Sequence, residues 1–389
     1  MKKISKANCL SSNCSPRQHP KTTMSSSQIL LNKKSLSQSL SQFDDKGPNA
    51  PSYSFTRSLK SIPVPVHNVM RDTGGARWLS DTLLEAALPF VALRNPIFIP
   101  KFITETIHHN KISYGTNSQQ YIELYKPSIN NENRTKLVYF IHGGAWGSGK
   151  PWYYRLVSRA FTSQGFTVAI CGFRTWPDAS LSKQIDDVLQ GTSKLAQIGF
   201  KNFQTFLVGH SSGAHVALWC LIRQKITKVD TPYPSPILNF SHFVGLSGVY
   251  KVSDHFLYEK NRGVEELSPM GGACGKTFSN LLEASIPEYL ANFVGERPGI
   301  SEAEVFKQIN ECKLLFLSGV EDVVVPFVNT AKTCRQLRSF GMSNITELYF
   351  PCCQHETPVM ELMTGGRVAD AVLDFLQNDV AKPTISSKL

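Results

Sequence analysis

The chain has 389 residues, of which 41% are hydrophobic and 10% aromatic, which suits one large globular domain with appendages or two modest domains. Its formal net charge is +11, but residues 1–60 hold ten Lys or Arg against two Asp, so most of this charge lies at the start of the chain. A basic tail joined to a nearly neutral remainder argues against a nucleic-acid-binding fold.

The basic start of the chain is also rich in serine. Residues 1–60 contain fourteen serines and few large apolar side chains, so they bury too little surface to offset the entropy of ordering. We expect a disordered tail over residues 1–75, although this composition is also typical of an organelle transit peptide. Nine scattered cysteines without a C-x-x-C pair favour a cytoplasmic location with reduced thiols; organelle targeting and peripheral membrane attachment are the alternatives.

An apolar stretch follows the tail from Leu83 to Pro100 (LLEAALPFVALRNPIFIP). Glu85, Arg94 and two prolines interrupt it, so it falls short of the roughly 18 uncharged apolar residues of a membrane-spanning helix. We predict that residues 76–111 form an amphipathic cap or pocket segment folded over the domain. The alternative is peripheral contact of residues 83–100 with a membrane surface.

Strands and helices alternate from about Lys111 onward. Residues 121–125 alternate like an edge strand, and the continuous apolar run at 137–141 is typical of a strand buried on both faces. Buried strands are also predicted at 166–171 and 203–208, and the alternation continues with strands at 242–246, 314–317 and 345–350. Helical spacing of apolar residues predicts helices at 152–163, 182–198, 213–223, 328–340 and 367–378. The alternation predicts an α/β fold: a doubly wound, mostly parallel sheet with helices on both faces.

This domain is predicted to span residues 112–380, followed by a short C-terminal tail over 381–389. Residues 251–309 break the alternation with short, Gly-rich and acidic pieces. We predict that they form an insertion that shapes a substrate pocket.

The segment His142–Lys150 (HGGAWGSGK) follows a predicted buried strand and fits two kinds of loop. Its G-x-x-x-x-G-K spacing is that of a phosphate-binding loop, but such a loop needs Ser or Thr after the lysine to ligate Mg²⁺. Pro151 stands at that position, so the nucleotide-binding interpretation fails. Read from His142, the letters H-G-G-A-W match an oxyanion loop of an acyl-transferring enzyme.

A second motif, Gly209-His-Ser211-Ser-Gly213, connects a predicted buried strand to a predicted helix. Strand, G-x-S-x-G and helix together are the context of a nucleophile elbow, in which a sharp turn exposes the serine. Ser211 is therefore the candidate nucleophile. The N-terminus of the following helix favours negative charge that develops beside it.

The two motifs are chemically complementary. Acyl transfer through a tetrahedral oxyanion needs two or three backbone N–H donors directed at the place where the charge forms. We predict that the N–H groups of Gly144, Ala145 and Ser212 supply them. The adjacent glycines let the backbone approach a substrate closely.

A nucleophilic serine needs a base, and the base needs an orienting acid. In such folds both follow the serine in sequence, on loops at the carboxyl ends of later strands. Asp322 follows the apolar run LLFL, and His355 follows ITELYF. We predict both as triad members, with Glu321 as the less favoured acid. Eight other histidines are judged less suitable: His19, His108, His109, His142, His210, His215, His242 and His255.

Several neighbouring residues are given structural roles. Trp146 and Trp152 are expected in the pocket wall or core, and Cys353 is expected to be a buried thiol. Arg174 is expected to pair with Asp186 or Asp187. His210 either helps to position the elbow or is simply tolerated there.

The motifs at 142–146, 209–215 and 321–326, with the late His355, together resemble the α/β-hydrolase superfamily. Within it, the segment YGTNSQQYIELYKP at 114–127 is similar to the entry segment of the esterase branch that holds isoprenylcysteine methylesterase and kynurenine formamidase. The resemblance covers Ile112 to about Asp379. It implies a triad of Ser211, Asp322 and His355 and an oxyanion hole of Gly144, Ala145 and Ser212.

These motifs predict a serine hydrolase that needs no cofactor or metal and cleaves a carboxylic ester through an acyl-enzyme. The apolar segment 83–100 favours a hydrophobic small-molecule or lipidated ester, such as a prenylcysteine methyl ester. One alternative is an arylformamidase acting on N-formylkynurenine. Another is a ligand-binding α/β-hydrolase homologue that has lost turnover.

Overall fold

The computed structural model describes residues 98–127, 135–227, 237–296 and 306–378. The predicted tails at 1–75 and 381–389, and most of the apolar segment 83–100, lie outside these residues.

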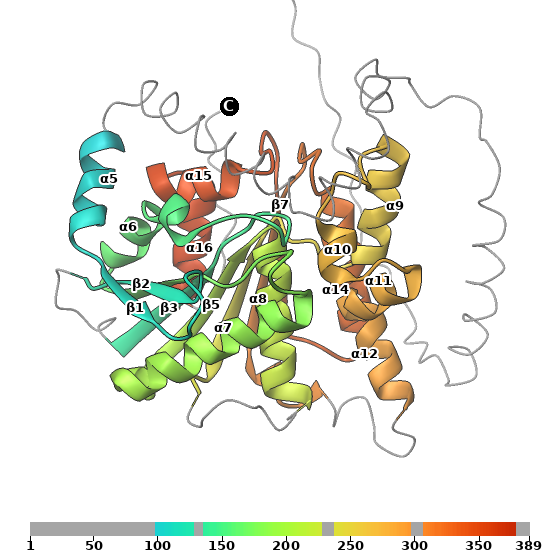
Figure 1. The fold of residues 1–389 in the computed structure, drawn as a ribbon, viewed down its shortest axis with the longest axis horizontal. Helices are drawn as coiled ribbons and strands as arrows, with labels where there is room; N and C mark the ends of the chain where they lie inside the picture. The colour runs from blue at the N-terminus through green and yellow to red at the C-terminus, as the bar shows by residue number, and fades with distance from the viewer. Residues whose placement is uncertain (1–97, 128–134, 228–236, 297–305, 379–389) are drawn as a thin grey trace, which may run out of the picture. The chain divides into compact units, whose positions relative to one another are not determined.

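The described residues form an eight-stranded sheet in the order β1-β2-β4-β3-β5-β6-β7-β8 (Figure 1). From β4 to β8 every neighbouring pair is parallel, whereas β1 and β2 pair antiparallel at one edge. The strands are β1 (Asn110–Ser113), β2 (Tyr121–Tyr125), β3 (Lys136–Ile141), β4 (Thr167–Cys171), β5 (Gln204–His210), β6 (Phe240–Leu246), β7 (Lys313–Gly319) and β8 (Ile345–Phe350). The predicted α/β fold with a mostly parallel sheet is confirmed.

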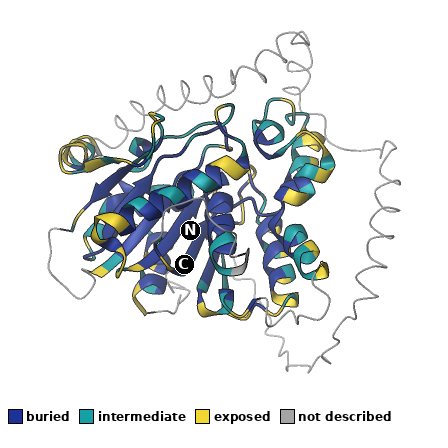
Figure 2. Ribbon diagram, turned by 60° about the horizontal axis from the view of Figure 1, so that its bottom comes forward, coloured by how far each residue is buried: buried dark blue, intermediate teal, exposed yellow. Residues whose placement is uncertain are grey.

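Alternate side chains of each central strand enter two different cores. In β3, Tyr139 packs into one core and Phe140 into the other, since successive side chains point to opposite faces. Helices cover both faces, which explains why these strands read as continuous apolar runs. Figure 2 shows the sheet buried between helices whose outer sides are exposed.

One core lies under α7, α8 and α14, and the other under α6, α15 and α16. The helices are α5 (Phe98–Ile107), α6 (Val157–Thr162), α7 (Leu181–Leu195), α8 (Ser212–Ile222), α9 (Val252–Arg262), α10 (Met270–Cys274), α11 (Phe278–Ala284), α12 (Ile286–Gly295), α14 (Phe327–Ser339), α15 (Thr357–Thr364) and α16 (Arg367–Asn378). Shorter turns are η2 (Pro151–Tyr154), η3 (Ala196–Phe200), η4 (Arg223–Thr227) and η5 (Ile309–Glu311).

The prediction of a single helix over residues 152–163 is wrong, because this stretch forms two shorter helices, η2 and α6. Arg155 lies in the break, and its guanidinium makes two hydrogen bonds of 2.9 and 2.7 Å to the buried carboxylate of Glu123 on β2. The interruption coincides with this tertiary ion pair, which holds the chain against the sheet. The insertion at 251–309 contains α9 to α12, which its short, Gly-rich pieces did not predict.

Helix α5 carries apolar side chains on an exposed face. Ile99, Ile103 and Ile107 recur every four residues and are all exposed, whereas Glu105 is buried and pairs with Arg159 of α6 at 2.9 Å. The side of this helix that carries Phe102 and Glu105 therefore faces the domain. Within the described ranges, no helix combines the length and apolarity needed to cross a membrane.

The carboxyl ends of the parallel strands lie at the same edge of the sheet. His142 follows β3, Ser211 follows β5, Asp322 comes after β7 and His355 comes after β8. The topology thus collects the predicted site residues from four segments of the chain.

Candidate active site

Ser211 occupies the sharp turn between β5 and α8. Its φ of 55° and ψ of −127° lie in a region that few residues other than glycine adopt. Such a conformation costs about 1–3 kcal/mol and persists only where the surroundings enforce it. Here the Ser211 N–H donates to the Leu246 carbonyl at the end of β6 at 2.8 Å, which anchors the turn to the neighbouring strand.

The two glycines of the elbow are needed for close packing. A Cβ atom on Gly213 would lie 2.2 Å from the His142 carbonyl oxygen, and one on Gly209 would lie 2.6 Å from the Gly213 carbonyl oxygen. Both distances are far shorter than real Cβ contacts. Gly213 therefore lets the elbow pack directly against the backbone at the end of β3.

The predicted triad side chains are within hydrogen-bond distance of one another. His355 Nε2 lies 2.9 Å from Ser211 Oγ, and His355 Nδ1 lies 2.8 Å from Asp322 Oδ2. A carboxylate can only accept, so Nδ1 carries the proton and Nε2 accepts from the serine hydroxyl. This tautomer is the one that allows His355 to take a proton from Ser211.

Backbone groups hold the acid in place. Asp322 Oδ1 accepts hydrogen bonds from the N–H groups of Val324 and Val325 at 2.9 and 2.8 Å, and its side chain is fully buried. The neighbouring Glu321 points elsewhere and accepts from the Cys353 N–H at 3.0 Å. Of the two candidate acids, the structure brings only Asp322 to His355.

The predicted oxyanion loop has an unusual backbone and lies against the elbow. Gly144, Ala145 and Trp146 all have positive φ, at 137°, 50° and 61°. A Cβ on Gly143 would lie 3.1 Å from Ser211 Cβ, so the absence of a side chain allows this approach. Within the described part of the chain, no group accepts from the N–H of Gly144, Ala145 or Ser212. These three donors stay available for an oxyanion.

Trp146 connects the oxyanion loop to the insertion through a buried histidine. The Trp146 indole N–H donates to His215 Nδ1 at 3.2 Å, and His215 Nε2 lies 2.8 Å from the Ala284 carbonyl oxygen at the end of α11. The Trp146 carbonyl also accepts from Trp176 N–H and Gln184 Nε2, both at 2.8 Å. Trp146 is thus a buried part of the loop's support, as predicted, while Trp152 packs at the surface of η2 against Phe102 and Tyr153.

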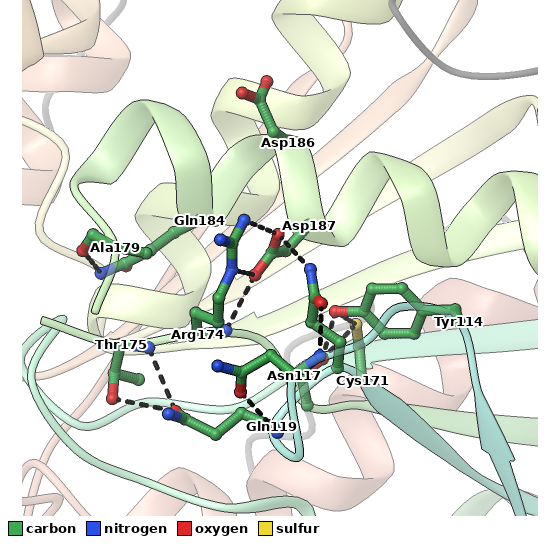
Figure 3. A network of polar contacts seen from close by, with 12 residues as sticks. Tyr114, Asn117, Gln119, Cys171, Arg174, Thr175, Ala179, Gln184, Asp186 and Asp187 are labelled. Atoms are coloured by element: carbon green, nitrogen blue, oxygen red, sulfur yellow. Dashed lines mark hydrogen bonds and ion pairs between the residues drawn. The ribbon is translucent and has the colours of Figure 1, made fainter.

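A polar network surrounds Arg174 and Thr175 (Figure 3), which directly precede Trp176, the residue whose N–H donates to the Trp146 carbonyl. Arg174 makes two side-chain hydrogen bonds to Asp187 at 2.8 and 2.6 Å, and its N–H donates to the same carboxylate at 2.9 Å. Asp186 pairs with Arg223 instead. The predicted pairing of Arg174 is therefore with Asp187, on α7.

Burial keeps three histidines near the site neutral. Burial lowers the pKa of His142 and of His215 to about 4, and it lowers that of His210 to about 3, with a further contribution from nearby His355. Burial also raises the pKa of the Cys353 thiol to about 11, so this thiol stays protonated, as expected of a structural cysteine. Among the residues that the structure describes, no group of three or more His, Cys, Asp or Glu side chains is arranged to hold a metal ion.

Comparison with known proteins finds similar sequences and a similar fold. A family model named BD-FAE matches residues 122–266. The isoprenylcysteine alpha-carbonyl methylesterase ICME of Arabidopsis thaliana is 29% identical over 202 residues, which cover 49% of this chain and 46% of that protein. A probable methylesterase of the same name from Oryza sativa subsp. japonica is 25% identical over 323 residues, covering 79% and 73% of the two chains. The chain thus spans about half the length of the first relative and about three quarters of the second.

Among solved structures, esterase B from Lactobacillus rhamnosis superposes with a TM-score of 0.55 at 18% identity, covering 76% of this chain and 94% of that one. Together these likenesses confirm the predicted α/β-hydrolase fold and the resemblance to methylesterases. The resemblance to kynurenine formamidase stays a prediction.

Proposed function

We propose that this chain, an α/β-hydrolase similar to methylesterases, is a serine hydrolase that cleaves a carboxylic ester through an acyl-enzyme. The observation that carries the proposal is the continuous set of hydrogen bonds from Asp322 through His355 to Ser211, on a strained elbow. A nucleophile, a base and an orienting acid in this order form the constellation for acyl transfer.

Each proposed step uses one of the groups described above. Ser211 Oγ attacks the ester carbonyl carbon while His355 Nε2 takes the hydroxyl proton. The carbonyl oxygen becomes negative, and the amides of Gly144, Ala145 and Ser212 donate to it. The bond to the leaving alcohol then breaks, and the alcohol takes the proton from His355. Water, activated by the same histidine, attacks the acyl-enzyme and releases the acid.

The surroundings favour a hydrophobic substrate. The loop that carries Asp322 exposes Val320, Val323 and Val324, and Val323 is 65% exposed. Since Val323 and Val324 directly follow Asp322, this apolar surface lies beside the proposed triad. Its position suits an ester whose acyl or thioether part is apolar, and the names of the plant relatives point to a prenylcysteine methyl ester.

The test compares hydrolysis by the parent and by Ser211→Ala. We expect the parent to cleave p-nitrophenyl butyrate and the variant to lose on the order of 10⁶ in turnover. Equal rates in the two proteins would contradict the proposal.

A substrate panel tests the finer claim. We expect kcat/KM for S-farnesylcysteine methyl ester to exceed that for S-methylcysteine methyl ester by at least about tenfold, because a buried hydrocarbon chain adds binding energy. No turnover of the farnesyl ester by an enzyme active on aryl esters would reject the prenyl substrate. Faster turnover of N-formylkynurenine would favour the formamidase alternative.

A further inference from the structure

A second set of hydrogen bonds connects the oxyanion loop to the backbone of His355. The Gly143 N–H donates to Tyr154 Oη at 3.1 Å, and the same oxygen lies 3.1 Å from His210 Nδ1. His210 Nε2 lies 3.2 Å from the His355 carbonyl oxygen. These three hydrogen bonds therefore connect the loop proposed to hold the oxyanion with the residue proposed to be the base.

The proton positions follow from the chemistry of each group. Tyr154 Oη accepts from Gly143 and has a single proton to donate, for which His210 Nδ1 is the acceptor. A carbonyl oxygen can only accept, so His210 Nε2–H donates to His355. A neutral imidazole has one donor and one acceptor, and both are used here. Burial, which disfavours the charged form, keeps the ring in this state.

The three connected segments come from distant parts of the sequence. Gly143 follows β3, His210 ends β5 and His355 follows β8, while Tyr154 ends η2. A Cβ on Gly143 would lie 2.9 Å from the His210 carbonyl oxygen and 3.1 Å from His210 Nδ1, so this glycine also lets the loop reach the imidazole. The rings of His210 and His355 are close as well, with centroids 5.2 Å apart.

We propose that Tyr154 and His210 are positioning residues that fix the distance between the oxyanion loop and His355. The inference rests on the proposed function. Proton transfer and oxyanion binding occur in one transition state, so the two parts must hold their relative geometry within about 0.5 Å. A displacement of about 1 Å typically costs around 10²-fold in rate. Neither Tyr154 nor His210 needs to touch the substrate for this role.

The alternative is that the two side chains only stabilise the fold, as many buried polar groups do. A stabilising role lowers the melting temperature and leaves the kinetics of the folded enzyme unchanged. A positioning role lowers kcat in the folded enzyme and leaves KM nearly constant, because the affected interactions belong to the transition state.

The experiment measures kcat and KM for p-nitrophenyl butyrate, the rate of fluorophosphonate labelling and the melting temperature. The variants are Tyr154→Phe, His210→Phe and His210→Gln; the glutamine amide restores a donor near the Nε2 position. Tyr139→Phe is the matched control. Its hydroxyl is also buried and donates to a backbone carbonyl, that of Val188 at 2.9 Å, and among the described residues no hydrogen bond joins it to the site.

We expect Tyr154→Phe to lower kcat and the labelling rate by about 10- to 100-fold with KM within threefold. His210→Phe should lower them at least as much, and His210→Gln less. The double variant Tyr154→Phe/His210→Phe should be no worse than His210→Phe alone, since both changes break one connection. Tyr139→Phe should keep the parental kcat despite a comparable loss of stability.

The inference is overturned if folded Tyr154→Phe keeps kcat within twofold of the parent, or if Tyr139→Phe lowers kcat equally. If Tyr154→Phe does not fold, the comparison of His210→Gln with His210→Phe decides, and equal kcat in these two contradicts the role. A parent enzyme that no fluorophosphonate labels would refute the proposed function itself. Labelling of the parent with an unchanged rate in Tyr154→Phe would refute only the positioning role.

Discussion

At the scale of single residues, the chemistry depends on which of two adjacent carboxylates reaches the imidazole. Glu321 and Asp322 are neighbours with the same charge, yet only Asp322 lies within 2.8 Å of His355. Glu321 bonds the Cys353 backbone, which lies two residues before His355 in the same loop. One carboxylate is therefore bonded to the imidazole of the proposed base, and the other to the backbone of the loop that carries this histidine.

A pair of isosteric substitutions separates these roles. We expect Asp322→Asn to lower kcat by about 10⁴, because an amide in this place favours the wrong tautomer of His355. Glu321→Gln should lower kcat by less than tenfold, since its amide oxygen still accepts from the Cys353 N–H. The measurement is kcat on an aryl ester for both variants. A larger loss in Glu321→Gln would show that the acid has been misassigned.

That the three side chains of the proposed triad lie together could be predicted, because each follows a buried strand in a short motif with its own chemistry. Ser211 has G-x-S-x-G, and Asp322 and His355 stand at successive strand ends. The part played by Tyr154 could not be predicted in this way. Its partner His210 is 56 residues away, and a tyrosine in a helix-like pattern has no signature of such a contact.

At the scale of elements, the site depends on the close approach of the elbow to the end of β3. Gly213 makes this approach possible, since even one added carbon would overlap the carbonyl oxygens of His142 and Ile141, at 2.2 and 2.5 Å. The elbow and the oxyanion loop are therefore one packed unit, and neither can shift without the other.

Substitution of a single glycine tests this packing. We expect Gly213→Ala to destabilise the protein by about 1–3 kcal/mol through overpacking and to abolish fluorophosphonate labelling. Gly295→Ala is the control, because a Cβ at the end of α12 meets no atom within 4 Å among the described residues outside its own helix backbone and chain neighbours. Urea unfolding and labelling of both variants measure the effect. Normal labelling of a stable Gly213→Ala protein would contradict the described packing.

The strands could be predicted closely because burial on both faces leaves a clear apolar run; the strand predicted at 137–141 is observed at Lys136–Ile141. The helices of the insertion could not be predicted from the sequence. Helix α9 buries only Val252, Ser253 and His255 of its eleven residues, so its apolar periodicity is weak. Its place is set by contacts with residues far along the chain, such as the bond from Tyr258 to the Val323 carbonyl.

At the scale of the whole molecule, three buried histidines couple stability to pH. Burial lowers the pKa values of His142, His210 and His215 in the folded state to between about 3 and 4. In the unfolded chain, histidine has a pKa of about 6.5. Between these values the unfolded chain binds protons that the folded protein does not, so stability rises with pH. This contribution is complete above pH of about 6.5 and is lost as the pH falls toward 4.

We therefore expect the free energy of unfolding to fall as the pH is lowered from 6.5 to 5. Each of the three histidines contributes a slope of up to about 1.4 kcal/mol per pH unit. His215→Gln should lower the free energy of unfolding at pH 7. It should also reduce the slope of this free energy against pH by the contribution of one histidine, up to about 1.4 kcal/mol per pH unit. Urea titrations at several pH values measure both proteins. An unchanged slope in His215→Gln would contradict the buried neutral state of His215.

The central claim is that Ser211 is an activated nucleophile, and the most direct measurement is the labelling of the purified protein by a fluorophosphonate probe. The account predicts one probe per chain, located on the Ser211 peptide by mass spectrometry and absent from Ser211→Ala. It also predicts that the probe no longer reacts once His355 is replaced by alanine. A folded parent protein that takes up no probe, or takes it up on another residue, would contradict the account and favour a ligand-binding homologue without turnover.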